Sequence, residues 1–241
     1  MRLRDLCVRL LRRDPARRPD CVEILARLGE PERRARTSES PFVGRKVELA
    51  ALDRAFARVA AGHPVVVHVA GRSGQGKSSL VRQWLTTLQR GRDLAVLRGR
   101  CRERESVPYK GIDAVIDALG IHLRHLEPSA LPQLPSEQID ALTQVFPVLH
   151  EVWPREGDPL PRFEAEEARN LCWVALRELI AALGRVRPVV IAIDDLQWSD
   201  LDSVAVLAAL RRPPDPPPCL FVLAYRAENR ESELIEALER D

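Results

Sequence analysis

Short apolar runs, bounded by polar or turn-forming positions, recur along this chain of 241 residues. The run at 188–195 is apolar without a break until it ends in two carboxylates, which suits a central parallel strand covered on both faces. The run at 65–70 is rich in β-branched residues and stops at a glycine. We therefore predict strands at 65–70, 94–101, 188–195 and 220–226.

The segments between these runs carry apolar residues at helical spacing. The longest of them, 168–183, has an apolar stripe that should pack on a sheet and is predicted to stop at Gly184. Predicted helices lie at 49–59, 77–88, 112–119, 136–146, 168–183, 204–210 and 228–238. Strands that alternate with helices indicate an α/β fold in three layers, with a mostly parallel sheet between helices.

A glycine-punctuated loop follows the first predicted strand and leads into a helix. From Gly71 to Ser78 it reads G-R-S-G-Q-G-K-S, which has the spacing of the phosphate-binding pattern G-x-x-x-x-G-K-[ST]. Glycines bring backbone N–H groups up to phosphate oxygens, and the helix start adds its positive dipole end. Because strand, pattern and helix coincide, we prefer this reading to a glycine-rich turn that matches by chance. The predicted nucleotide-binding residues of the loop are Gly71, Ser73, Gly74, Gln75, Gly76, Lys77, Ser78 and Ser79.

Specific roles follow for residues at both ends of the site. Lys77 is expected to reach the β- and γ-phosphates of the nucleotide, and the Ser78 hydroxyl to bind Mg²⁺. Asp194 and Asp195 end the third predicted strand, where parallel sheets open onto their ligand crevice. We expect Asp194 to hold the Mg²⁺ shell and Asp195 to polarise the attacking water. The alternative is a buried strand with acids at its end by chance.

Two further strings carry a family resemblance. Residues 194–203 read D-D-L-Q-W-S-D-L-D-S, and together with the phosphate loop they resemble the AAA and STAND ATPases. The string F-V-G-R-K-V-E-L at 42–49 is similar to the opening of these ATPases, which implies that the backbone near Val43 and Gly44 touches the adenine. ATP is preferred over GTP on this resemblance, and no guanine-reading N-K-x-D string is present.

The resemblance also implies roles for several arginines. Arg226, which ends the last predicted strand, matches the sensor-1 position that reports the γ-phosphate and is counted as catalytic. Arg211 and Arg212 either reach a neighbouring subunit's γ-phosphate or are exposed cations at a helix end. Arg45 is either a nucleotide or interface contact or an exposed arginine at a helix start.

Three other features can be explained by a structural role as well as by a functional one. The string G-R-C-R-E-R-E-S-V-P-Y at 99–109 resembles ATPases that bacteria fuse to Ser/Thr kinases or transcriptional regulators, with Glu105 and Tyr109 on the nucleotide side or simply shaping a strand-to-helix turn. Ser199 and Asp202 have the spacing of a capping box for the next helix. His122 and His125 lie one helical turn apart with no third ligand, so a metal site is not expected.

The first 29 residues are predicted to form a separate segment of two short amphipathic helices. The stretch from Leu6 to Asp20 resembles the end of a protein-kinase C-lobe, in which Arg18 would pair with a buried glutamate. The catalytic and nucleotide motifs of kinases are missing from the sequence, so kinase activity is not expected. The alternative is a helical hairpin that packs on the main domain. We predict domains at 1–29 and 41–241, joined by a polar linker at 30–40.

Composition limits the partners and the cellular compartment that we expect. A net charge of +2, with basic and acidic residues interspersed, does not indicate nucleic acid. Lysine is scarce, and one of the three lysines is Lys77. Five scattered cysteines without a C-x-x-C pair suggest reduced thiols, and no apolar run is long enough to span a membrane. Together these features favour a cytoplasmic protein.

The leading hypothesis is a regulatory ATPase that binds ATP and Mg²⁺, hydrolyses ATP slowly and uses its nucleotide state as a switch. The alternatives are a non-catalytic ATP-binding or interaction module, and a fragment of a larger Ser/Thr kinase–ATPase signalling protein. The resemblance implies that a helical lid and a sensor-2 arginine, not found before Asp241, belong to a larger protein. Expected partners are ATP or ADP and other domains or proteins of a signalling system, and the oligomeric state stays open.

Overall fold

The computed structural model describes residues 9–10, 19, 44–103, 108–154, 163–229, 235–236 and 238. The chain divides into two compact units, residues 1–44 and 45–241. The predicted kinase-like segment at 1–29 lies almost wholly outside the described residues, and the linker at 30–40 lies entirely outside them. Those two expectations therefore stay predictions, and the fold described below is that of the second unit.

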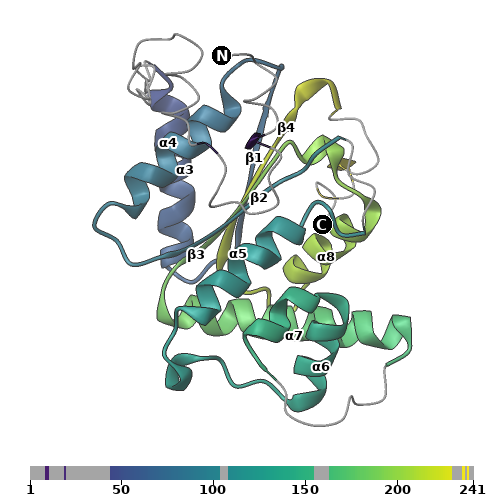
Figure 1. The fold of residues 1–241 in the computed structure, drawn as a ribbon. Helices are drawn as coiled ribbons and strands as arrows, with labels where there is room; N and C mark the ends of the chain where they lie inside the picture. The colour runs from purple at the N-terminus through teal and green to yellow at the C-terminus, as the bar shows by residue number, and fades with distance from the viewer. Residues whose placement is uncertain are drawn as a thin grey trace. The chain divides into compact units, whose positions relative to one another are not determined.

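A four-stranded sheet forms the centre of the second unit, and all of its strand pairs are parallel. Its strands are β1 (Val65–Gly71), β2 (Ala95–Arg100), β3 (Val189–Asp194) and β4 (Cys219–Arg226). The spatial order is β1-β4-β3-β2, so β4 lies between the strand that leads into the glycine loop and the strand that ends in the two carboxylates (Figure 1). The four predicted strands and the parallel sheet are thereby confirmed.

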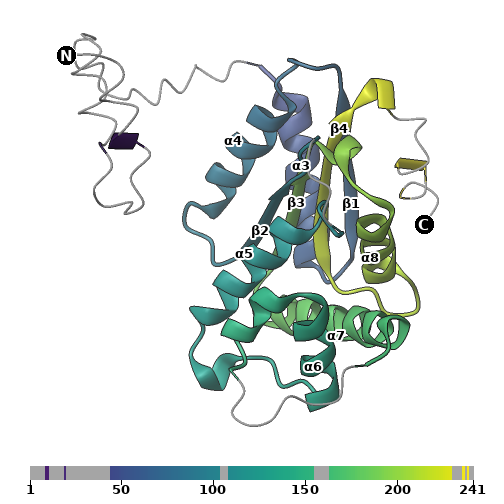
Figure 2. The same ribbon diagram turned by 45° about the vertical axis from the view of Figure 1, so that its right-hand side comes forward.

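Helices cover both faces of this sheet, as the two ribbon views show (Figures 1 and 2). On one face, α3 (Lys46–Ala60) and α4 (Lys77–Gln89) pack against β1 and β4. On the other face, α5 (Asp113–Arg124) packs on β2 and β3, and α7 (Ala165–Val186) packs on β3 and β4. Two further helices, α6 (Ser136–Val145) and α8 (Leu201–Arg211), pack on α7. The predicted three-layer α/β fold is confirmed.

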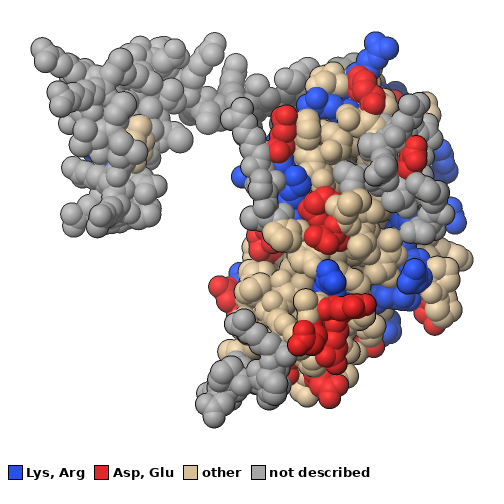
Figure 3. All heavy atoms as spheres, turned by 90° about the vertical axis from the view of Figure 1, so that its right-hand side faces the viewer, with Lys and Arg blue, Asp and Glu red and all other residues tan. Residues whose placement is uncertain are grey.

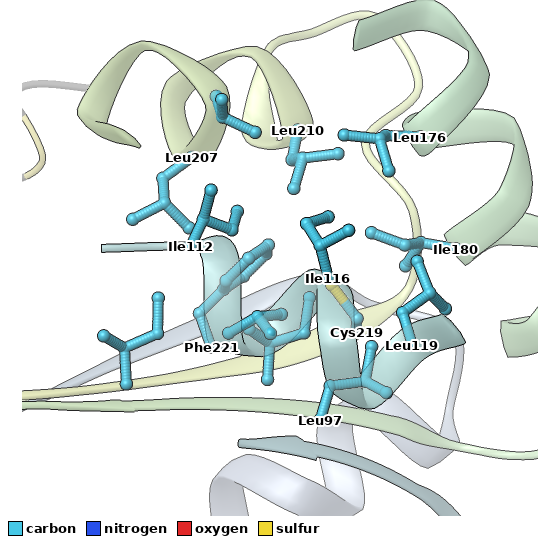
Figure 4. Close-up of a cluster of buried hydrophobic side chains, with 14 of the residues drawn as sticks. Leu97, Ile112, Ile116, Leu119, Leu176, Ile180, Leu207, Leu210, Cys219 and Phe221 are labelled. Atoms are coloured by element: carbon cyan, nitrogen blue, oxygen red, sulfur yellow. The ribbon is translucent and has the colours of Figure 1, made fainter. Parts of the chain in front are cut away.

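The apolar pattern along each strand explains its place in the sheet. β3 and β4 are buried along their length except at the last residue, because both faces of these two inner strands are covered. β2, at one edge of the sheet, alternates between buried and more exposed positions. The larger hydrophobic core lies between the sheet and the second helical face, where Ile112, Leu176, Leu207 and Phe221 are fully or almost fully buried (Figure 4).

The first helical face has a smaller packing centre of its own. The rings of Phe56 and Trp84 meet edge to face, with centroids 6.4 Å apart. The indole N–H of Trp84 donates to Asp53 Oδ1 over 2.9 Å, so the buried polar atom of this large side chain is satisfied. This contact joins α3 to α4 and so fixes the helix that follows the glycine loop.

Two element boundaries differ from the predictions. α7 runs through Gly184 and ends at Val186. A Cβ at Gly184 would lie 3.3 Å from the carbonyl oxygen of Pro218, so this glycine permits a close approach of two segments and does not stop the helix. The helix predicted at 228–238 opens as a 3-10 turn, η5 (Ala227–Asn229), and residues 235, 236 and 238 are helical. The other 3-10 turns are η2 (Pro128–Ala130), η3 (Pro147–Glu151) and η4 (Leu196–Trp198).

Within the described part of the chain, no helix is long and apolar enough to cross a membrane. The same residues include no group of three or more His, Cys, Asp or Glu side chains that could hold a metal ion. His122 is half-buried, and desolvation lowers its pKa. Cys101, Cys172 and Cys219 are buried free thiols, and burial raises the pKa of Cys101 to about 12.

Candidate nucleotide site

The glycine loop between β1 and α4 has the backbone geometry that an anion requires. Gly74 and Gly76 have φ angles of 78° and 80°, in the left-handed region that suits glycine. α4 begins directly afterwards at Lys77, so its first unpaired amides face the loop. Residues 72–76 are exposed, whereas Lys77 and Ser78 are half-buried. The loop is therefore open to a ligand, whereas the start of α4 beneath it is partly buried in the domain.

Hydrogen bonds within the loop hold this shape. The backbone N–H of Arg72 donates to Gln75 Oε1 over 2.8 Å. The Lys77 ammonium donates to the carbonyl oxygens of Gly71 and Arg72, at 2.7 and 3.0 Å. A Cβ at Gly71 would lie 2.7 Å from Gln75 Oε1, so a larger residue there would displace the Gln75 side chain from its contact with Arg72. Lys77 thus lies folded against the loop that it is predicted to serve.

Arg45 contacts the loop from the start of α3. Its Nη2 donates to the backbone carbonyl of Gln75 over 2.8 Å, and its Nη1 pairs with Glu48 at 2.9 Å. Arg45 also lines a cavity of about 190 Å³ that lies between α3, β1 and the glycine loop, together with Glu48, Val67, Gln75 and Lys77. Arg45 is an exposed residue at the start of α3 whose guanidinium touches the loop backbone, and its contact with a nucleotide or interface stays a prediction.

The second half of the site lies at the carboxyl end of β3. Asp194 Oδ1 accepts from the backbone N–H of Asp195 over 3.0 Å, and Asp195 has a φ of 55°. Asp194 and Ser78 line the same cavity, which has a volume of about 560 Å³. A hydroxyl and a carboxylate oxygen are donors that Mg²⁺ accepts, and Mg²⁺ completes its octahedron with phosphates and water. The residues predicted to hold Mg²⁺ therefore fit that role.

Asp195 is tied down by two side chains. Its Oδ2 accepts from Arg100 Nε at 3.0 Å and forms an ion pair with Arg100 Nη2 at 2.9 Å. Its Oδ1 accepts from Gln197 Nε2 at 3.2 Å. Both carboxylate oxygens are therefore engaged. The sequence analysis assigned no role to Arg100 or Gln197, although Arg100 was visible as a cation at the end of a predicted strand.

Arg226 lies beside the glycine loop because β4 pairs with β1. In the register of the sheet it stands opposite Gly71. Its guanidinium carbon lies 5.5 Å from the centroid of the Trp198 ring, and its backbone N–H donates to Gln197 Oε1 over 3.1 Å. The predicted sensor position is thus next to the loop, with its cation on an aromatic face.

The helix after the acidic strand is capped differently from the prediction. Asp200, and not Ser199, is the N-cap of α8, since its Oδ1 accepts from the backbone N–H of Ser203 over 2.8 Å. The Ser203 hydroxyl donates to Asp200 Oδ2 over 3.0 Å and accepts from the backbone N–H of Gly111 over 2.9 Å. The capping box of Ser199 and Asp202 was therefore wrong by one position, and the actual cap also anchors the loop before α5.

Several other predicted residues have different surroundings from those expected. The Tyr109 ring packs edge to face on Phe146 and Trp173, with centroids 5.4 and 5.7 Å away, so it lies half-buried against the hydrophobic core. Arg211 is only 8% exposed and donates to the carbonyl of Leu238, which does not fit an exposed cation at a helix end. Arg212 is exposed, and Glu105 and Val43 lie outside the described residues.

The lining of the larger cavity has an excess of positive charge. Its lining combines five cations with three carboxylates: Arg82, Arg98, Arg100, Arg102, Lys110, Asp113, Asp117 and Asp194. Elsewhere the charges mix, and Figure 3 shows acidic and basic side chains interspersed over one face of the molecule. The concentration of positive charge beside Ser78 and Asp194 favours an anionic ligand there.

This fold and site define a P-loop NTPase of the class in which an additional strand separates the loop strand from the acidic strand. A comparison with protein-family models matches residues 41–222 to the AAA ATPase domain, and the chain belongs to that family. Membership implies nucleotide binding, usually with Mg²⁺, by an ATPase domain. A search of curated proteins found no match.

Proposed function

We infer that this chain is the nucleotide module of a regulatory ATPase, which binds ATP with Mg²⁺, hydrolyses it slowly and acts as a switch. One observation carries the proposal. The glycine loop and the paired carboxylates of β3 meet at one edge of the sheet, where Ser78 and Asp194 line the same cavity. Neither half would be sufficient alone, because one supplies the anion cradle and the other supplies the metal ligand and the base.

Binding depends on groups that are already in position. The amides of the glycine loop and the start of α4 bind phosphate oxygens, and Lys77 moves from the loop carbonyls to the β- and γ-phosphates. A magnesium ion held by Ser78 and Asp194 would neutralise phosphate charge. The cavity beside Arg45 accommodates the remainder of the nucleotide. The family resemblance assigns the adenine contact to the backbone near Val43 and Gly44.

Slow turnover is supported by the surroundings of Asp195. A general base must turn an oxygen lone pair toward the attacking water, and contacts from Arg100 and Gln197 hold both oxygens of Asp195 in their present orientation. Hydrolysis therefore waits for a rearrangement that releases one of them. A protein that spends long periods in the ATP state is suited to signalling, in which the nucleotide state is read by other domains.

The signalling context rests on the resemblance to ATPases of the STAND type that are fused to bacterial kinases or transcriptional regulators. Residues 1–29 would then be the end of a kinase lobe, without kinase activity of their own. The basic cavity wall and Arg212 are open to other domains or proteins. A cytoplasmic location suits the buried free thiols of Cys101, Cys172 and Cys219.

The first test is calorimetric titration of the purified chain with Mg-ATP and Mg-ADP. We expect micromolar binding that Lys77→Ala abolishes. Lys46→Ala is the matched control, because Lys46 is an exposed lysine at the start of α3 and its loss should leave the affinity unchanged. A folded wild-type sample that binds neither nucleotide would refute the proposal.

A second candidate function is a non-catalytic ATP-binding module, and the Arg100–Asp195 ion pair favours it too. Single-turnover assays with Asp195→Asn separate the two candidates. Under the first, wild type releases phosphate slowly and the variant loses at least about tenfold in rate while it still binds ATP. Under the second, neither protein releases phosphate above the rate without enzyme.

A further inference from the structure

Gln197 links two parts of the site through the two ends of its amide. Its side chain is almost completely buried, and its Oε1 accepts from the backbone N–H of Arg226 over 3.1 Å. Because a backbone N–H needs an acceptor, this contact fixes which way the amide faces. The Nε2 atom is left to donate to Asp195 Oδ1 at 3.2 Å. Gln197 therefore ties the carboxylate of Asp195 to the end of β4.

The side chain of Arg226 is held by Trp198, the residue that follows Gln197 in the same 3-10 turn. Its guanidinium carbon lies 5.5 Å from the centre of the Trp198 ring, and a cation is attracted to the face of an indole. Trp198 is half-buried and packs against the hydrophobic core, so its ring is a fixed surface. No carboxylate among the described residues pairs with Arg226. The cation thus rests on a neutral ring next to the phosphate loop.

This arrangement is sensitive to the number of phosphates. Arg226 stands opposite Gly71, the first residue of the loop, so an anion bound there competes with the indole for the guanidinium. Charge-assisted contacts with phosphate are stronger than contacts with a neutral ring. ATP brings one more phosphoryl group than ADP, and it should draw the guanidinium away from Trp198 where ADP does not.

We propose that Trp198 and Gln197 are positioning residues for the nucleotide reaction. Trp198 holds the Arg226 guanidinium until a triphosphate binds, and Gln197 fixes the Asp195 carboxylate to the end of the same strand. The inference rests on the proposed function and assigns it two residues that touch neither the phosphates nor the metal. Their effect is transmitted through Arg226 and Asp195.

The first test uses tryptophan emission, measured at nucleotide concentrations that calorimetry has shown to saturate the site. A non-hydrolysable Mg-ATP analogue should change the emission of wild type, and Mg-ADP should not. Trp198→Phe should abolish that change, whereas Trp173→Phe, which alters a ring in the aromatic cluster around Tyr109, should retain it. Without nucleotide, Arg226→Gln should show the emission that wild type shows with the analogue.

Three outcomes separate the hypotheses. Equal emission with both bound nucleotides, or a triphosphate response that survives Trp198→Phe, would overturn the assignment of Trp198. Failure of either nucleotide to bind in the calorimeter would refute the proposed function itself, and this inference with it.

The second test uses Gln197→Glu, which keeps an oxygen for the Arg226 N–H and replaces the donor to Asp195 with a second carboxylate. Two facing carboxylates repel each other, so the Asp195 carboxylate loses the orientation that Gln197 gives it. The single-turnover rate of phosphate release should fall by at least about tenfold, with the Kd for Mg-ATP unchanged within about twofold. Gln197→Met, which keeps the volume and loses both hydrogen bonds, controls for packing.

A merely structural role for Gln197 would lower the melting temperature of both variants and leave the rate of phosphate release in place. An unchanged rate in Gln197→Glu, with ATP still bound, would therefore overturn the assignment of Gln197. A wild-type protein that binds ATP and never hydrolyses it would also overturn it, because there would be no reaction to position.

Discussion

The two halves of the site are built in different ways. In the phosphate loop, residues 71–79, the side chains of Gln75 and Lys77 contact backbone atoms only three to six positions away. In the acidic segment, residues 194–203, the partners are far along the chain. Asp195 pairs with a residue 95 positions earlier, Ser203 with one 92 positions earlier, and Gln197 with one 29 positions later. One half is a local structure, and the other is assembled by the fold.

Exposure differs in the same way. Residues 72–76 of the phosphate loop are exposed, whereas Leu196, Gln197, Ser199 and Ser203 of the acidic segment are buried. Substitutions in the loop should therefore affect ligand affinity more than stability. Substitutions in or against the acidic segment should affect the free energy of unfolding, because they disturb buried contacts between distant parts of the chain.

The largest effect on stability is expected from Gly111→Ala, beside the acidic segment. The new Cβ would collide with Ser199 Oγ and lie 2.9 Å from Ser203 Cβ, and the backbone N–H of Gly111 is bonded to the Ser203 hydroxyl. Overpacking of this kind costs about 1–3 kcal/mol, which urea unfolding measures as a lower midpoint.

Gly120→Ala is the matched control for this change. Gly120 lies inside α5, and its new Cβ would find only Leu149 Cδ2 at 3.5 Å, an ordinary contact. Alanine is the better helix former, so this variant should be neutral or more stable by about 0.5–1 kcal/mol. Equal destabilisation by both substitutions would contradict the account of the acidic segment as a tightly assembled region.

A smaller effect is expected from Gly74→Ala in the phosphate loop. No atom lies within 4 Å of the new Cβ, but the φ of 78° strains an alanine by about 1–2 kcal/mol. The loop is exposed and should relax, which turns its amides away from the phosphates. We expect calorimetry to show Mg-ADP binding weakened about tenfold, with a loss of stability no larger than the strain.

Gly91→Ala separates strain from function. Gly91 follows α4, has the same φ of 78° and also has no atom within 4 Å of the new Cβ, but it is outside the site. Gly91→Ala should lose about as much stability as Gly74→Ala, and its affinity for Mg-ADP should be unchanged. If both variants bind nucleotide equally well, the conformation of Gly74 is not what shapes the anion cradle.

The same contrast explains which features could be predicted from sequence. The phosphate loop depends on glycines and a lysine at fixed spacing, so it can be recognised from one continuous stretch of the sequence. Strands and most helices were also predictable, because apolar periodicity reflects local burial. Gly184 shows the limit of such local signals, since its function is to admit Pro218 from a distant segment.

The contacts of the acidic segment needed the order of the strands. The first strand, β1, pairs with the last strand, β4, and only the order β1-β4-β3-β2 places Arg226 opposite Gly71 and Arg100 opposite Asp194. The ion pair between Arg100 and Asp195 follows from that register. Nothing in the residues around position 100 distinguishes this arginine from Arg98 or Arg102, which line the same cavity.

Arg100→Gln tests whether the fold restrains the base, and its expected effect is the smallest of the three. The Arg100 side chain is 68% exposed and that of Asp195 is 22% exposed, so the ion pair is worth about 0.2–1 kcal/mol. If hydrolysis must first break this pair, its removal should raise kcat by about 1.5- to 5-fold and leave the Kd for Mg-ATP unchanged. Single-turnover phosphate release measures the change.

Arg98→Gln is the control, because Arg98 lies two positions earlier in the same strand and lines the same cavity without contacting Asp195. It removes an equal charge and should leave kcat unchanged. Added salt screens an exposed ion pair, so wild-type turnover should rise with ionic strength while that of Arg100→Gln stays flat. A fall in kcat for Arg100→Gln would show that Arg100 supports hydrolysis and does not restrain it. The acidic segment would then be assembled for turnover in its resting state, as the phosphate loop is for binding.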